Sequence, residues 1–229
     1  MQFQCPSAVL DPSVGACGLR LWVEGKKQLE LLSRLTEQGE TMRQVFILRC
    51  QGEEAKRIAK KLDISKRTVE LRVTQIRNIL SLPNIVDWIR ALSVVEVFRN
   101  IKFNYLESST WPQVDLSEKE ERPNDPFIFG ERLIKSLEER KKFFETLNGS
   151  GVPWKVRQIV LYRVAGWKQK KVAAKLDMGL RTVEQYAKSL RNLLDGKDLD
   201  YWVSCIALAE LYFGRKIDAE DEQSWPTTF

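Results

Sequence analysis

The segment from residue 43 to residue 80 reads RQVFILRCQGEEAKRIAKKLDISKRTVELRVTQIRNIL, and it recurs in altered form from residue 157 to residue 194. At a shift of 114 residues, about 16 of the 38 positions are identical without any gap. The shared positions include the tetrapeptide RTVE, which stands at 67–70 and again at 181–184. The chain therefore contains an internal duplication.

Each copy has the pattern of two helices joined by a short turn. Ile58, Ala59 and Leu62 recur at helical spacing and are expected to face inward, and Ser65 supplies an N-cap for a new helix. Gly52 stands where the preceding helix should end, as a C-cap glycine does. The helix from 66 to 80 carries one apolar stripe, which consists of Val69, Val73, Ile76 and Leu80.

This pattern resembles the LuxR-type DNA-binding domain, in which a glycine is followed by I-A-x-x-L, then by I-S-x-x-T-V-E and a long helix. It is also similar to region 4 of sigma factors, which is a structural relative. The resemblance implies an all-α fold and a helix-turn-helix in each copy. It also implies that the helix beginning at Lys66, and its counterpart in the second copy, enter the major groove of DNA.

Bulk properties narrow the function classes. The 229 residues are 43% hydrophobic, contain no apolar run of about 18 residues and begin with no signal-peptide pattern, which predicts a cytoplasmic protein without a membrane partner. The sequence has no histidine, and its four cysteines show no C-x-x-C spacing. We therefore expect no zinc or other metal site and no histidine-based catalysis. An enzyme such as a recombinase would need a separate catalytic domain, for which the two units leave no length, so we expect no catalytic residue, no cofactor and no enzyme activity. Cys50 and Cys205 lie in apolar surroundings and are expected to be buried.

The positive charge is concentrated in the two copies. Residues 43–80 carry a net charge of +6 and residues 155–194 carry +8, whereas the rest of the chain carries −8. A solvated helix face can account for a single charged run. A surplus confined to the two motif copies is what a polyanion-binding surface requires.

The duplication also predicts the domain organisation. The repeat continues into an apolar helix expected at 85–103, where Trp88 pairs with Trp202, so each unit should contain about five helices. A helix is expected to precede the first motif from about Leu19. The expected parts are a flexible arm at 1–18, a first unit at 19–104, a Pro-rich acidic linker at 105–127, a second unit at 128–213 and a frayed tail at 214–229.

The resemblance assigns base-facing positions on the second helix of each motif. A glutamate there can accept a hydrogen bond from cytosine. Alternatively, it is a solvated side chain that interacts favourably with the positive end of the helix dipole. Leu71 is replaced by Gln185 and Thr74 by Lys188, so the two copies should read different sequences. The predicted base-facing residues are Glu70, Leu71, Thr74, Glu184, Gln185 and Lys188.

Phosphate contacts are expected from basic residues that surround these positions, although any one of them can also be a plain solvated charge. Most of them are basic in both copies, but Lys66 becomes Leu180 in the second copy. The predicted phosphate-binding residues are Lys56, Lys66, Arg67, Arg77, Lys170, Arg181 and Arg191.

Two functions are compatible with these patterns. The preferred one is a bacterial transcription regulator, associated with the nucleoid, that binds double-stranded DNA in a sequence-specific manner. It would act as an intramolecular pseudo-dimer in which the helices around Trp88 and Trp202 pack together, with a homodimer as a further option. In the alternative, the sigma-like units dock on RNA polymerase or another transcription factor, and DNA binding is secondary.

Overall fold

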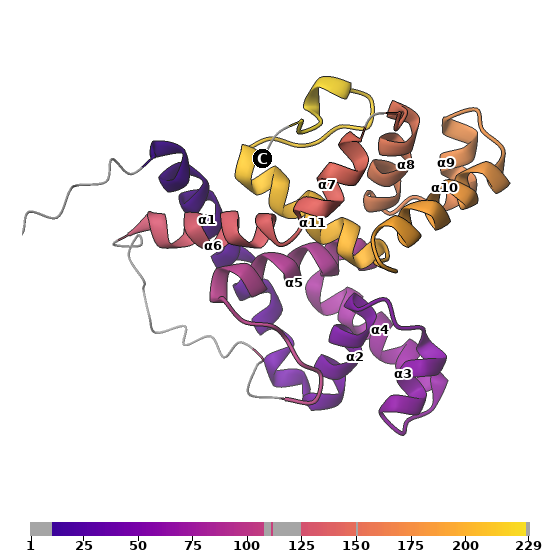
Figure 1. Cartoon of the computed structure of the whole chain (residues 1–229). Helices are drawn as coiled ribbons and strands as arrows, with labels where there is room; N and C mark the ends of the chain where they lie inside the picture. The colour runs from indigo at the N-terminus through magenta and orange to yellow at the C-terminus, as the bar shows by residue number, and fades with distance from the viewer. Residues whose placement is uncertain (1–10, 108–110, 112–124, 150, 228–229) are drawn as a thin grey trace, which may run out of the picture.

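A computed structural model describes residues 11–107, 111, 125–149 and 151–227, and this part of the chain contains eleven α-helices and no strand (Figure 1). The prediction of an all-α fold is thus confirmed. The first unit consists of α1 (Pro12–Ser33), α2 (Glu40–Cys50), α3 (Ala55–Lys61), α4 (Lys66–Leu80) and α5 (Ile85–Arg99). The second consists of α6 (Pro126–Glu138), α7 (Lys141–Asn148), α8 (Trp154–Val164), α9 (Gln169–Lys175), α10 (Leu180–Leu193) and α11 (Leu199–Phe213).

Local capping residues and glycines set the ends of the helices in each helix-turn-helix. Gly52 and Gly166 follow α2 and α8 with φ angles of +79° and +85°, a conformation that glycine adopts without steric cost. Ser65 caps α4 by accepting a hydrogen bond from the Thr68 amide at 3.0 Å. Gly179 takes the same place before α10 and offers no side-chain cap. The same elements thus follow in the same order in both units.

Both units begin earlier than the sequence patterns suggested. Helix α1 starts at Pro12, not near Leu19, because the Asp11 carboxylate accepts from the Ser13 amide at 2.9 Å and Pro12 fits the first helical turn. Asp125 caps α6 in the same way, 114 residues later. Residues 12–18 of the expected arm are therefore helical, and residues 1–10 lie outside the described part of the chain.

The first helix of the second unit is broken. Helix α1 runs without interruption, whereas the chain turns at 139–140 between α6 and α7. The side chain of Arg140 is buried at this break, where Nη1 donates to the Ser136 carbonyl at 2.7 Å and Nε donates to the Ser204 hydroxyl at 3.2 Å. These bonds fix the turn that sends α7 away from the line of α6.

The segments after α5 and α11 pack on their own units. The expectation of a frayed tail from Gly214 is wrong, because Trp225 is buried and its Nε1 donates to the Asn148 side chain at 2.7 Å. In the first unit Trp111, which stands 114 residues earlier inside the expected linker, is buried against Phe46 with ring centroids 5.8 Å apart. Residues 108–110 and 112–124 of that linker lie outside the described residues.

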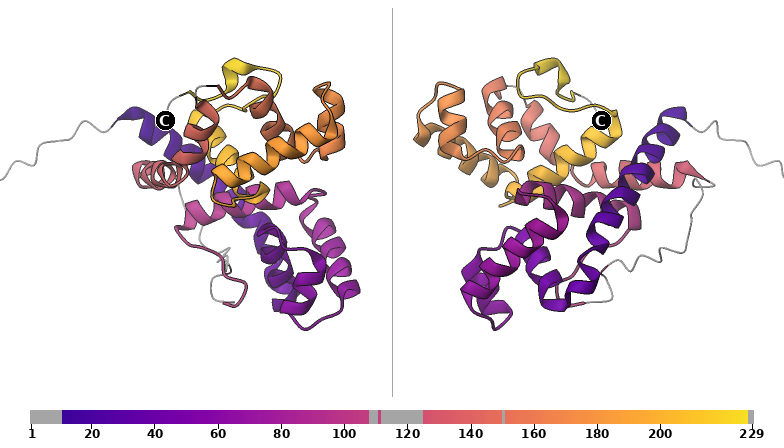
Figure 2. Two further views of the ribbon diagram at one scale, coloured as in Figure 1. Left: turned by 45° about the vertical axis from the view of Figure 1, so that its right-hand side comes forward. Right: turned by 180° about the vertical axis from the view of Figure 1, so that it is seen from behind.

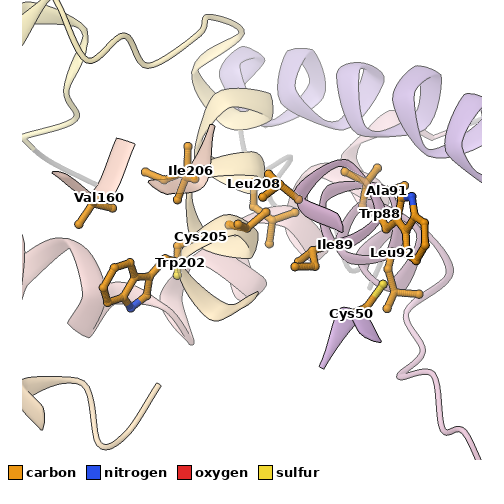
Figure 3. Packing of buried hydrophobic residues seen from close by; sticks show 14 of the residues in the cluster. Cys50, Trp88, Ile89, Ala91, Leu92, Val160, Trp202, Cys205, Ile206 and Leu208 are labelled. Atoms are coloured by element: carbon orange, nitrogen blue, oxygen red, sulfur yellow. The ribbon is translucent and has the colours of Figure 1, made fainter. Parts of the chain in front are cut away.

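The two units pack against each other through equivalent helices. Helix α5 packs on α11, and α1 crosses α6 (Figures 1 and 2). At the crossing the backbones approach closely, since a Cβ placed on Gly18 would lie 1.9 Å from the Pro126 carbonyl oxygen. Figure 3 shows Ile89 and Leu208 between α5 and α11, while Trp88 and Trp202 point to opposite sides. Both tryptophans are buried.

Polar contacts across the junction are nearly reciprocal. Arg132 of α6 donates to the Phe98 carbonyl at the end of α5 at 2.7 Å. Arg20 of α1 donates to the carbonyls of Leu211, at 2.6 Å, and of Tyr212, which stands 114 residues after Phe98. Each unit thus supplies an arginine to the last helix of the other, where carbonyl groups lack intrahelical partners. The arrangement approximates two-fold symmetry.

Candidate nucleic-acid interface

The long helix of each motif turns its apolar stripe inward. The first and last residues of its RTVE tetrapeptide, an arginine and a glutamate, point outward. Val69 and Val183 are fully buried, and the arginine and the glutamate on either side of Thr-Val are exposed. Because residues at i, i+1, i+4 and i+5 of a helix share one face, the exposed positions after the valine form a continuous surface. The six predicted base-facing residues are all exposed, and Leu71 keeps 56% of its surface accessible.

Glu70 and Glu184 have different neighbours. The Glu70 carboxylate lies 3.3 Å from the Lys66 ammonium, one helical turn earlier. Leu180 replaces that lysine in the second unit, and within the described part of the chain Glu184 makes no ion pair. Any contact of Glu70 with a base must therefore compete with an internal partner, and a contact of Glu184 need not.

The second unit gathers two of its predicted base-facing residues around one hollow. A depression of about 540 Å³ lies along α10, and Gln185 and Lys188 line it together with Tyr186. Arg72 is the counterpart of Tyr186 in the first unit, where its Nη1 donates to the Gln75 side chain at 3.0 Å. The two long helices thus present different shapes as well as different polar groups.

All seven predicted phosphate-binding residues are exposed, as that role requires. Arg191 differs from most of the others because its guanidinium forms an ion pair with Asp198, in the turn that leads to α11. Its counterpart Arg77 lies near Arg49, whose pKa is lowered first by burial and second by the Arg77 charge. Of the seven, only Lys66 and Arg191 form ion pairs within the described part of the chain.

Two sets of residues at this surface were not singled out by the sequence patterns. Arg49 and Arg163 are half-buried and hold the turn between the first two motif helices, where Arg49 Nη1 donates to the Glu53 carbonyl at 2.6 Å. Arg163 donates equivalently to the Trp167 carbonyl at 2.5 Å. The sequence signal for these two residues was that arginine occupies the equivalent position in both copies. The second set is Lys168 and Lys171, which are exposed beside Lys170 at the start of α9.

The two motifs lie on the same side of the molecule. Figures 1 and 2 show α3 with α4 and α9 with α10 on the side away from the crossing of α1 and α6, with α5 and α11 between the two pairs. Contacts at the turns support this placement, since a Cβ on Gly52 would lie 3.9 Å from the Asp200 carboxylate. A Cβ on Gly166 would lie 3.8 Å from Val86, the residue that is equivalent to Asp200.

Neither a membrane-spanning helix nor a metal-binding cluster was found in the part of the chain that the structure describes. No helix there is long and apolar enough to cross a bilayer. No group of three or more cysteine, aspartate or glutamate side chains in those residues is placed to hold a metal ion.

A comparison with protein families agrees with the geometry of the first motif. Neither curated proteins nor solved structures gave a match to the chain. Residues 39–92, which span α2, α3, α4 and the start of α5, match the model of a family described as bacterial regulatory proteins, luxR family. This part of the chain thus carries a LuxR-type helix-turn-helix domain of the kind found in DNA-binding regulators.

Proposed function

We propose that the chain is a transcription regulator that binds double-stranded DNA in a sequence-specific manner and inserts α4 and α10 into adjacent major grooves. The observation that carries the proposal is the placement of both motifs on one side of the molecule, each with its predicted base-facing residues exposed. The family match covers only the first motif. Support for the second comes from its equivalent element order and its exposed cations.

Electrostatics provide the affinity in this proposal. Exposed lysine and arginine side chains around each long helix would neutralise phosphates and release counterions, which makes binding depend steeply on salt. The rest of the chain carries a net charge of −8, so the surplus of positive charge is concentrated in the motifs. This distribution favours one orientation of the protein on the duplex and a location at the bacterial nucleoid.

The proposal can be tested in two steps. Selection from random duplexes should yield an enriched sequence, and affinity for that sequence should fall about a thousandfold between 50 and 200 mM salt if six phosphates are contacted. Replacing both Arg67 and Arg181 with alanine should reduce the salt slope, and Lys135→Ala on α6 should leave it unchanged. A flat salt dependence would contradict the proposal.

The alternative partner is RNA polymerase or another transcription factor, on which a sigma-region-4-like unit would dock. Naked duplex DNA distinguishes the two functions, because the regulator must bind its selected sequence without polymerase. If polymerase were required for any DNA binding, the alternative would replace the proposal.

A further inference from the structure

A large hollow lies away from the predicted DNA-binding surfaces, at the junction of the two units. It has a volume of about 830 Å³, is open to solvent, and is lined by α1, Leu82, α5, α11 and residues 214–216. This size falls within the range of about 300–1,000 Å³ that is typical of small-molecule sites, which often lie between domains. Its apolar lining consists mainly of Leu19, Val23, Leu31, Leu82, Val94 and Leu211.

Two apolar residues of α1 that line the hollow are exposed, whereas their equivalents on α6 are buried. Leu19 and Val23 are 42% and 53% exposed, whereas their equivalents Leu133 and Leu137 are 0% and 4% exposed. The difference follows from the break at 139–140, since α1 continues as a straight wall where the second unit turns. On the other side, the hollow between α6 and the end of α5, which includes the equivalents of Glu210 and residues 214–216, has a volume of only about 180 Å³. The junction is therefore nearly filled on the side of α6 and open on the side of α1.

The polar groups of this hollow favour an anion. Its basic residues are Arg20, Lys27, Arg90, Arg215 and Lys216, and its acidic residues are Glu24, Asp87 and Glu210. The Glu210 carboxylate is already neutralised, because it lies 2.6 Å from Arg90 and 3.1 Å from Lys216. Arg90 and Arg215 are replaced by Ser204 and Ile101 at the equivalent positions on the other side, so these two guanidinium groups have no counterpart there.

Hydrogen-bonding capacity remains at the guanidinium groups. A guanidinium carries five N–H donors, and Arg90 uses Nη1 for Glu210 while Arg215 makes one long contact of 3.5 Å to the Gln223 carbonyl. Planar groups of this kind bind carboxylate or sulfonate oxygens in pairs, with charge-assisted hydrogen bonds. The apolar wall of Leu19 and Val23 faces the same space and would take a hydrocarbon or ring.

We infer that this hollow is a binding site for a small amphipathic anion, with an apolar body of about eight to ten carbon atoms and one carboxylate or sulfonate group. The apolar body would lie along α1, and the anionic group would lie at Arg215 and Arg90. Because α1 and α5 belong to one unit and α11 to the other, the bound molecule would contact both. The inference does not depend on DNA binding.

The test uses the full-length protein and anilinonaphthalene sulfonate, a fluorescent probe with an apolar ring system and one anionic group. We expect one probe molecule to bind per chain and octanoate to displace it, whereas the uncharged octanol should be at least about tenfold weaker because it lacks the charge-assisted contacts. The native state must be confirmed by a cooperative melting curve, since partly folded states also bind this dye.

Variants locate the site. Val23→Gln and Arg215→Gln change exposed side chains of the hollow and should weaken octanoate about five- to tenfold, in proportion to the apolar burial and the charged contact that each removes. Matched controls are Ile128→Gln, which alters a 46% exposed apolar residue of α6, and Lys135→Gln in the smaller hollow. Equal effects of groove and control variants, or equal displacement by octanol, would overturn the inference. So would displacement only by an amphipathic helical peptide, which would point to a protein partner instead.

Discussion

At the level of single residues, the two long helices share a glutamate but differ in what surrounds it. Glu70 is paired with Lys66 at 3.3 Å, and Glu184 has the apolar Leu180 in the corresponding place. A glutamate that must leave an exposed ion pair gives up about 0.5 kcal/mol, which is small beside a good base contact. The larger difference between the helices therefore arises at Gln185 and Lys188, which replace Leu71 and Thr74.

Substitutions on α10 should separate base recognition from phosphate binding. Gln185→Ala is expected to cost about 1–3 kcal/mol on the preferred sequence and to relax the preference at one position of one half-site. Arg181→Ala should weaken all sequences alike and reduce the salt slope by about one. Binding to the selected duplex and to single-base variants measures both effects. An identical uniform loss for the two variants would show that α10 does not read bases as assigned.

Asp200, in the first turn of α11, should limit stability at neutral pH. Burial near the Gly52 turn raises its pKa, so the folded state disfavours the ionised carboxylate. A group of this kind stabilises the fold below its unfolded pKa of about 4, and that contribution is lost as the pH rises through its folded pKa. Asp200→Asn is therefore expected to raise the urea midpoint at pH 7 and to have little effect below about pH 4.

The first turn of α5 supplies the control for that experiment. Asp87 also lies in the first turn of a final helix, where a carboxylate interacts favourably with the helix dipole. Asp87→Asn should lower stability at pH 7 by a few tenths of a kcal/mol. If both variants shifted the midpoint in the same direction, burial of Asp200 would not be the cause.

At the level of elements, the sequence predicts the helix-turn-helix well because its boundaries depend on local chemistry. Ser65 and Gly52 impose a cap and a left-handed turn whatever the rest of the chain does. The start of α1 was missed because Pro and Gly in residues 11–18 suggested a loop, although Asp11-Pro12 is also a helix start signal. The glycines in that stretch have a tertiary role, since Gly18 permits the contact with α6.

The packed tails could not be predicted from local patterns. Trp225 and Trp111 are held by partners distant in the sequence, namely Asn148 and Phe46. The composition of these stretches predicts only polar, irregular segments. The 114-residue equivalence of the two tryptophans was visible in the sequence, and extending the repeat to them would have shown that the duplicated unit includes its tail.

The crossing of α1 and α6 should depend on the absence of a side chain at Gly18. A Cβ there would lie 1.9 Å from the Pro126 oxygen and 2.6 Å from the Gly130 nitrogen, and both are backbone atoms that cannot rotate away. Gly18→Ala is therefore expected to destabilise the protein by about 3 kcal/mol, as overpacking of a tight contact does. Urea unfolding of the full chain measures the change.

Gly15 on the same helix is the matched control. A Cβ at Gly15 would meet only the ring of Phe127, at 3.2 Å, and that ring can shift. Alanine also favours a helix over glycine by about 1 kcal/mol, so Gly15→Ala should be neutral or stabilising. Equal losses at the two positions would mean that the close approach at Gly18 does not limit packing.

At the level of the whole molecule, the packing of α5 on α11 and of α1 on α6 leads us to propose that the two motifs act as one rigid pair with a fixed half-site spacing. The reciprocal contacts of Arg20 and Arg132 with the last helix of the other unit favour such a pair over independent units on a tether. Two motifs facing one side of the duplex would reach successive major grooves, about 34 Å or 10 base pairs apart.

Changing the spacing of the half-sites should therefore abolish most of the binding energy. Because Gln185 and Lys188 differ from Leu71 and Thr74, the selected site should be an imperfect palindrome, and inserting five base pairs at its centre would turn one half to the far side of the duplex. We expect affinity to fall to that of a single half-site, and five base pairs added outside the site should have no effect. Units joined only by a flexible segment would tolerate the central insertion, since loop closure costs rise slowly with distance. Unchanged affinity after the central insertion would thus rule out the rigid pair, while a loss with both insertions would mean that DNA length, not spacing, controls binding.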